Sequence, residues 1–184
     1  MPYIFFKDRA NEVNHNSHMG MIGNGNLCME SFSNFKPTIN FVEEEDGNTS
    51  IRRSEMGEIH TCNLISLNLA ELTSDELEKH VALAVRALDN TIDLTVTPLK
   101  ESNKHNLMYR TVGVGAMGLA DYLAREYMIY EESINEINEL FERIALYSIK
   151  ASALLAKDRG AYKAFKGSKW DQAIFFGKKR EWYE

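Results

Sequence analysis

The sequence predicts an α/β fold, because one segment alternates with the two-residue period of a strand and two others repeat with the period of a helix. The strand is expected over about residues 62–70. One of its faces would carry Ile65, Leu67 and Leu69, and the other would carry Cys62, Leu64, Ser66 and Asn68. Buried polar groups need partners, so we expect Cys62 to point into a ligand pocket.

Two helices are predicted within a helical region at residues 74–160. Thr73 and Glu76 have the spacing of a capping box, and the apolar residues that follow are Leu77, Val81, Ala84, Leu88 and Ile92. A longer helix should begin at Ser133 and stop at Gly160. Its apolar stripe consists of Ile137, Leu140, Phe141, Ile144, Ser148, Ala151 and Leu155. That stripe requires a second layer to cover it.

The composition is that of a globular domain with one core, since 44% of the residues are hydrophobic and 26% are charged. The 27 acidic residues outnumber the 21 basic ones, so we expect no nucleic-acid partner. No apolar run reaches the roughly 20 residues of a membrane span, and no signal peptide is recognisable, so we expect a cytoplasmic location and no membrane contact. Cys28 and Cys62 should then be free thiols.

Loop signals divide the chain further. Residues 15–30 are rich in glycine and asparagine and lack an apolar period, which predicts an ordered loop. The acidic run at 43–50 predicts a solvated tip. Residues 2–6 are typical of a strand and residues 178–184 stop without a clear cap, so we expect a piece of something longer.

The run Gly113–Gly118 (GVGAMG) matches the glycine pattern of dinucleotide-binding folds. In that interpretation residues 107–112 would be the preceding strand, and Glu131 would bind the ribose. The helix available at residues 119–126 is short for such a unit. We therefore expect glycine-mediated close packing of a helix, and dinucleotide binding is the weaker alternative.

Five side chains are of the types that zinc prefers: His15, His18, His60, Cys28 and Cys62. Their spacing matches no standard zinc pattern. We expect surface or loop histidines and no metal site.

The segment from Asn26 to Glu30 places an amide, a thiol and a carboxylate on alternate residues of the glycine-rich loop. In an extended chain, Asn26, Cys28 and Glu30 would project to the same side. The alternative is an ordinary loop with a buried cysteine and a solvated Glu30.

Four segments together resemble the large, catalytic subunit of class I ribonucleotide reductases. Asn26–Glu30 matches its Asn-Leu-Cys-x-Glu loop, and His60–Leu69 is similar to its Cys-Asn-Leu-x-Ser-Leu-Asn strand. Thr111–Leu123 resembles its glycine-containing helix, and Arg159–Asp171 its Gly-Ser-x-Trp segment. The cobalamin-dependent class usually has Asn-Pro-Cys-Gly-Glu instead, so class I is favoured.

The resemblance implies a role for each site residue. Cys28 would become a thiyl radical that takes the hydrogen from the ribose 3′ carbon, and Glu30 would remove the 3′ hydroxyl proton. Asn26 would position the substrate. Cys62 would be one of two thiols that reduce the 2′ carbon and end as a disulfide.

The resemblance also implies that residues 1–184 are a single partial domain, a central fragment of a ten-stranded α/β barrel. The finger loop would span about residues 15–36. No cofactor would be bound directly. The expected partners are the remaining parts of the large subunit, a metal-containing small subunit that supplies the radical, a ribonucleoside diphosphate, and an external dithiol such as thioredoxin or glutaredoxin.

Two positions depart from the family pattern. Gly25 stands where a serine is commoner, and Ile65 stands where the family strand has glycine. Residues alternate sides along a strand, so Ile65 points away from Cys62 and altered packing is expected there.

The alternative from a different functional class is a noncatalytic helical binding or assembly module of the same shape.

Overall fold

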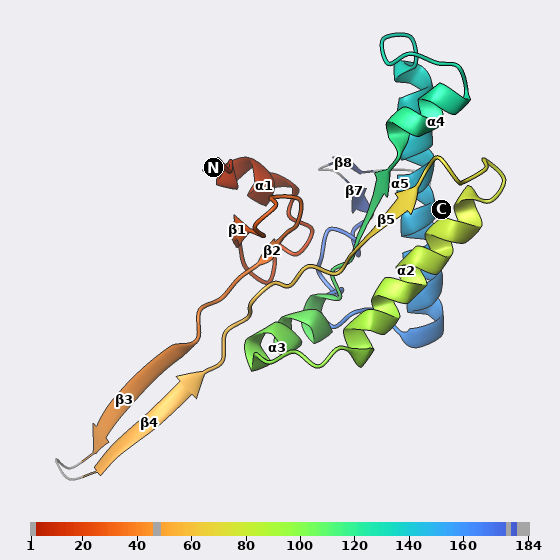
Figure 1. The fold of residues 1–184 in the computed structure, drawn as a ribbon. Helices are drawn as coiled ribbons and strands as arrows, with labels where there is room; N and C mark the ends of the chain where they lie inside the picture. The colour runs from red at the N-terminus through yellow and green to blue at the C-terminus, as the bar shows by residue number, and fades with distance from the viewer. Residues whose placement is uncertain (1–2, 46–48, 176–177, 180–184) are drawn as a thin grey trace. The chain divides into compact units, whose positions relative to one another are not determined.

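The computed structural model describes residues 3–45, 49–175 and 178–179, and it mixes helices and strands as predicted (Figure 1). The helices are α1 (Lys7–Val13), α2 (Leu77–Leu94), α3 (Lys100–Tyr109), α4 (Leu119–Arg125) and α5 (Ile134–Arg159). The strands are β1 (Ile22–Gly25), β2 (Phe32–Asn34), β3 (Ile39–Glu45), β4 (Thr49–Glu55), β5 (Leu64–Asn68), β6 (Gly113–Met117), β7 (Ile174–Phe175) and β8 (Lys178–Lys179). Within these residues the strands pair only two by two, so they form no closed barrel.

The chain divides into two compact units. The first unit contains residues 1–62, 96–111 and 162–184, and the second contains residues 63–95 and 112–161. Each unit therefore combines segments that are distant in the sequence.

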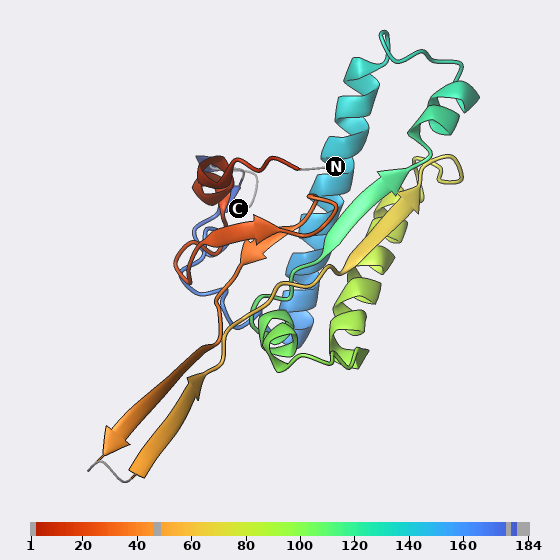
Figure 2. The ribbon, with the colours of Figure 1, turned by 60° about the vertical axis from the view of Figure 1, so that its left-hand side comes forward.

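The second unit is built on the parallel pair β5–β6, one face of which is covered by α2 and α5 (Figure 2). Strand alternation explains this, because Leu67 and Leu69 point to the helices while Leu64 and Ser66 are exposed. One buried core cluster of this unit consists of Leu67, Leu69, Leu77, Val81, Ala84 and Ile144. The predicted strand and its apolar face are confirmed.

Both predicted helices are present, but the predicted apolar stripe of α5 is only partly covered: Ile144 and Ala151 are buried, whereas Phe141 is 42% exposed. Every predicted core position of α2 is buried, and α5 ends at Gly160, whose φ of 89° suits a glycine. The capping box predicted at Thr73 did not form: α2 has Glu76 at its N-cap with no side-chain capping bond, and Thr73 Oγ1 donates to the Glu76 carboxylate instead. None of the helices in the described ranges is long and apolar enough to cross a membrane.

The glycine run at 113–118 is a strand for most of its length, so the expectation of a helix across 111–123 is wrong there. β6 occupies 113–117, and the helix α4 begins only at Leu119. The glycines fit close strand packing, because a Cβ at Gly113 would lie 2.6 Å from Leu64 Cδ2. Dinucleotide binding needs the glycines in the turn after a strand, so this geometry contradicts that alternative.

Among the described residues, the first unit contains three antiparallel strand pairs, β1–β2, β3–β4 and the short pair β7–β8. Both strands of the first hairpin lie within the predicted finger loop at about residues 15–36, but only β1 lies within the ordered loop predicted at 15–30. The acidic run at 43–50 belongs to β3 and β4 where it is described, so a loop is wrong for those residues, and residues 46–48 lie outside the described residues. That the run is a solvated tip stays a prediction. Residues 3–6 are not in a strand, contrary to expectation.

The interior of the first unit is mainly polar. Its buried polar side chains are Asn14, Ser33, Asn34, Glu58, Ser102, His105, Asn106 and Ser168. Many are paired with one another: Asn14 Nδ2 donates to Asn34 Oδ1 at 2.8 Å, and Tyr109 Oη donates to Glu58 Oε2 at 2.9 Å. Buried polar groups are tolerated only when paired, so this network specifies how the segments of the unit fit together.

The helix α3, which the sequence did not predict, brings His105 and Tyr109 into this interior. His105 is 0% exposed, and its Nε2 lies 2.9 Å from Ser33 Oγ. Burial, together with the nearby charge of His60, lowers the pKa of His105 to about 3. Burial also raises the pKa of Tyr109 to about 12. Both side chains are therefore neutral around pH 7.

We predict that the first unit loses stability as the pH falls below about 6.5. The folded chain keeps His105 neutral down to about pH 3, whereas the unfolded chain protonates it near pH 6.5. The unfolded state thus binds more protons between these values, and the free energy of unfolding decreases as the pH falls through them.

The matched variant is His105→Gln, which keeps a donor for Ser33 and cannot titrate. The wild-type free energy of unfolding should fall faster than that of the variant by up to about 1.4 kcal/mol per pH unit. Tryptophan fluorescence during urea unfolding measures this, because Trp170 belongs to the same unit. Parallel pH profiles for the two proteins would contradict the account.

Candidate active site

The turn that joins β1 to β2 carries the predicted site residues, and the Asn26 side chain closes it. Asn26 Oδ1 accepts hydrogen bonds from the backbone N–H groups of Glu30 (3.1 Å) and Ser31 (3.0 Å). The backbone N–H of Asn26 donates to Ser31 O at 3.1 Å, and that of Met29 donates to Asn26 O at 3.1 Å. Asparagine suits this place, since its side chain bonds readily to nearby backbone.

This turn brings Asn26 and Glu30 into direct contact, because Asn26 Nδ2 donates to Glu30 Oε1. The expectation of an extended segment is wrong: Met29 has a φ of 61°, and the chain reverses direction. The two side chains meet across a turn and not along a strand. A neutral amide donates to a carboxylate without adding charge, and the second carboxylate oxygen can still accept, as a general base requires.

Cys28 lies between these two residues in the turn and is an exposed free thiol. Leu27 beside it is 85% exposed. The alternative of a buried cysteine is therefore wrong for Cys28. An exposed thiol on a hydrogen-bonded turn is accessible to a substrate or to another part of a larger protein.

Gly25 permits an aromatic contact at the base of the turn. A Cβ at residue 25 would lie 2.5 Å from Phe32 Cε1, closer than real contacts allow. The Phe32 ring in turn stacks on Phe5, with ring centroids 4.9 Å apart. The departure from the commoner serine thus has a steric explanation in this chain.

A backbone bridge brings the segment before Cys62 to the same hairpin. Glu58 N donates to Lys36 O at 2.8 Å, and Lys36 N donates to Glu58 O at 3.1 Å. Gly57 makes the approach possible, since a Cβ there would lie 2.2 Å from Lys36 O. Two residues further on, His60 Nε2 lies 2.6 Å from Ser31 Oγ.

Cys62 is an exposed free thiol that precedes β5. The neighbouring Thr61 is anchored, because its Oγ1 donates to Asn106 Oδ1 at 2.7 Å. Ile65 packs against the core of the second unit, as its parity predicted. The expectation that Cys62 points into a pocket has no support here, since the pocket found in the second unit does not include it.

The Gly-Ser-x-Trp segment packs against the start of the predicted finger loop. Trp170 stacks on His15 with ring centroids 4.2 Å apart, and Lys169 N donates to His15 O at 2.8 Å. Burial lowers the pKa of His15, with a further contribution from the charge of Lys169. Ser168 is fully buried. Two segments far apart in the sequence therefore support the loop jointly.

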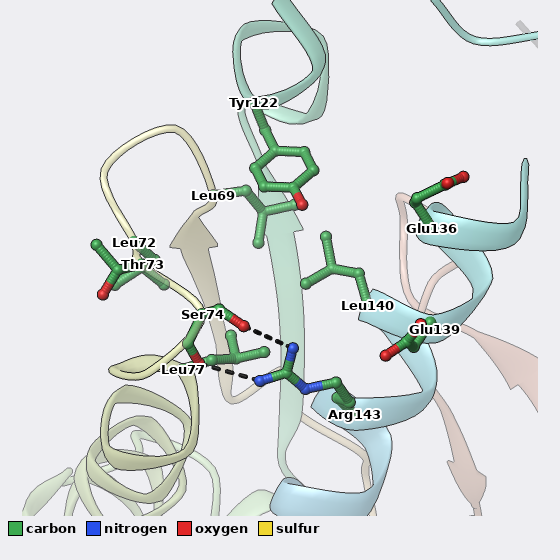
Figure 3. A pocket seen from close by; sticks show the side chains of 10 residues that line it. All are labelled: Leu69, Leu72, Thr73, Ser74, Leu77, Tyr122, Glu136, Glu139, Leu140 and Arg143. Atoms are coloured by element: carbon green, nitrogen blue, oxygen red, sulfur yellow. Dashed lines mark hydrogen bonds between the residues drawn. The ribbon is translucent and has the colours of Figure 1, made fainter. Parts of the chain in front are cut away.

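The pocket in the second unit, of about 160 Å³, lies among the ends of α2, α4 and α5 (Figure 3). Arg143 reaches across it to Ser74, with bonds of 2.8 Å to Oγ and 3.0 Å to the carbonyl oxygen. Its lining residues are Leu69, Leu72, Thr73, Ser74, Leu77, Tyr122, Glu136, Glu139, Leu140 and Arg143. None of the predicted site residues lines it.

Sequence reasoning missed the polar residues that support the turn. Ser31, Ser33 and His105 were not singled out, and His60 was considered only as a surface histidine or a zinc ligand. The alternation of Ser31 and Ser33 on either side of Phe32 was an available signal, because side chains two residues apart in an extended segment project to the same side. Their histidine partners come from distant segments and had no local signal.

Comparison with known proteins gives a family and relatives that carry the name of one enzyme. The family described as "Ribonucleotide reductase, barrel domain" matches residues 1–183. A ribonucleoside-diphosphate reductase subunit alpha from Synechocystis sp. is 44% identical over 185 residues, which cover 100% of this chain and 22% of the relative. Proteins of the same name from Treponema pallidum (38% identical, covering 97% of this chain and 22% of the relative) and Helicobacter pylori (34%, 95% and 27%) also match.

The chain thus spans about a quarter of the length of these relatives. The match is continuous across both compact units, because residues of each lie within the range 1–183. The motifs that suggested a resemblance lie in the same range. The chain belongs to the ribonucleotide reductase barrel-domain family.

Proposed function

We propose that this chain is part of a ribonucleoside-diphosphate reductase, in which it contributes the radical thiol Cys28 and the reducing thiol Cys62. The enzyme would convert ribonucleoside diphosphates to 2′-deoxyribonucleoside diphosphates, the precursors for DNA replication. Residues 1–184 would be one partial domain of the catalytic barrel. The observation that carries the proposal is the turn at residues 26–31, where Asn26 holds Glu30 beside the exposed Cys28.

In the first step Cys28, as a thiyl radical, would take the 3′ hydrogen atom of the ribose and become a thiol. Glu30 would accept the proton of the 3′ hydroxyl group, and Asn26 would orient that hydroxyl without adding charge. The carboxylate is two residues from the thiol, and the 3′ carbon and its oxygen are bonded neighbours. One turn can therefore place the thiol near the 3′ carbon and the carboxylate near the 3′ hydroxyl group.

In the second step the 2′ hydroxyl would leave as water, and the 2′ carbon would receive two electrons from a dithiol. Cys62 would be one thiol of that pair, and its partner would come from another part of the large subunit. The pair ends as a disulfide, so the atoms and electrons balance as ribonucleotide plus dithiol to deoxyribonucleotide, disulfide and water. Cys28 then returns to its thiyl radical form by giving its hydrogen atom back to the 3′ carbon radical of the product.

The proposed enzyme requires partners that supply what this chain does not. A metal-containing small subunit would generate the radical, and an external dithiol such as thioredoxin or glutaredoxin would reduce the disulfide for the next turnover. The remaining parts of the large subunit would complete the barrel. We propose the cytoplasm as the location, because its reducing conditions keep both thiols free.

A noncatalytic assembly module of the same shape is the alternative. Such a module would not need the Asn26–Glu30 contact beside an exposed thiol, so this contact favours the catalytic interpretation. Co-purification from the source cell tests whether this chain is part of a complete reductase. We expect the chain to be recovered with polypeptides that complete the barrel and with a radical-generating subunit.

Cys28→Ser should abolish deoxyribonucleotide formation in the assembled enzyme while leaving the fold intact. A hydroxyl holds its hydrogen too strongly to carry the radical, whereas its size fits the exposed turn. Product formation by chromatography measures this. Met29→Leu is the matched control, because it removes a neighbouring sulfur at similar volume and should retain activity. Product formation by Cys28→Ser would contradict the assignment.

Glu30→Gln should slow the reaction by about 10² to 10⁴-fold, the usual contribution of a general base. The glutamine oxygen can still accept from Asn26 Nδ2, so the turn persists while the base is lost. Single-turnover rates with ribonucleoside diphosphate measure the effect. A rate equal to that of the wild type would rule out proton removal by Glu30.

A further inference from the structure

We propose that His60 is a positioning residue that ties the turn carrying Cys28 and Glu30 to the segment leading into Cys62. The inference rests on the function proposed above and assigns the residue that keeps its two thiol-bearing segments together. His60 lies two residues before Cys62, and its partner Ser31 directly follows Glu30.

Ser31 belongs to the turn through its backbone and to His60 through its side chain. Its N–H donates to Asn26 Oδ1, and its carbonyl oxygen accepts from Asn26 N. Its hydroxyl oxygen lies 2.6 Å from His60 Nε2. A shift of His60 is thus transmitted to the same backbone groups that close the turn.

The His60 ring depends strongly on this single contact. Its Nδ1 is buried and has no hydrogen-bond partner among the described residues. Loss of Ser31 Oγ would leave both ring nitrogens unpaired, which is costly for a partly buried group. Burial lowers the pKa of His60, so the ring is neutral near pH 7 and keeps one donor.

A second serine–histidine pair supports the first. His60 and His105 have ring centroids 5.0 Å apart, and His105 binds Ser33, which lies on β2 two residues after Ser31. His105 is fully buried, so its ring can move little and limits the positions that the neighbouring His60 ring can take. The charged and titratable groups near the His105 ring are Glu58, Lys104 and Tyr109. Glu58 forms an ion pair with Lys104 and accepts a hydrogen bond from Tyr109.

This link has a direct use in the proposed reaction. The two thiols act in sequence on neighbouring carbons of one ribose, so the segments that carry them must keep a constant spacing. Small errors in such spacing reduce rates considerably. A short hydrogen bond between the two segments, backed by a buried ring, would provide that constraint.

The test is a double-mutant cycle in the assembled enzyme with Ser31→Ala and His60→Phe. Each single change should lower kcat by about tenfold, as expected for one lost hydrogen bond. The double variant should be no slower than Ser31→Ala, because the two changes remove the same link. Multiplying effects, or unchanged kcat in either single variant, would overturn the inference.

Two kinds of control separate positioning from general stability. Ser31→Thr and His60→Gln keep the bonding groups and should restore most of kcat. Ser33→Ala breaks the companion pair but leaves the bond between Ser31 and His60 in place, so it should lower kcat much less than Ser31→Ala does, even if it lowers the melting temperature. If Ser33→Ala slowed turnover as much as Ser31→Ala, or the conservative variants failed to rescue, His60 would not be a positioning residue.

A readout without catalysis distinguishes this inference from the proposed function. Amide hydrogen exchange of residues 26–31, measured by mass spectrometry on the full chain, should be about tenfold faster in Ser31→Ala and His60→Phe. It should be unchanged in His60→Gln. Faster exchange in an enzyme without reductase activity would refute the function but support the link; unchanged exchange would refute the link.

Discussion

The hydrogen bonds of the Asn26 side chain are the constraint on which the proposed active site depends. A neutral amide donates and accepts at once, so Asn26 can hold two backbone N–H groups and the Glu30 carboxylate together. An acidic side chain at this position could not donate to Glu30. The turn that results leaves Cys28 exposed and places the Glu30 carboxylate, the proposed base, two residues from it.

The two compact units are stabilised in different ways, and the difference bears on function. The second unit buries aliphatic side chains between β5 and two helices, which provides stability without directional requirements. The first unit buries paired polar groups around His105, Asn34 and Glu58, and each pair has one acceptable geometry. Because the cysteines lie on the first unit, their surroundings are defined by directional bonds and not by apolar packing alone.

Local sequence periods predicted the elements whose contacts repeat along the chain. The helices at 77–94 and 134–159 and the strand at 64–68 follow this rule. The strand at 113–117 did not, because glycine and alanine have no strand preference and this segment is ordered by its distant parallel partner. The residues of the candidate site were identified by their motif, whereas the turn and its histidine supports required the three-dimensional structure.

The most direct test of the central claim is a crystal structure of the assembled enzyme with a bound ribonucleoside diphosphate. The account predicts the ribose 3′ carbon in van der Waals contact with Cys28 Sγ, at about 4 Å, and the 3′ hydroxyl within about 3.2 Å of the Glu30 carboxylate. The turn at residues 26–31 should remain closed by Asn26. A ribose bound away from this turn, with Cys28 and Glu30 contacting no part of the substrate, would contradict the account.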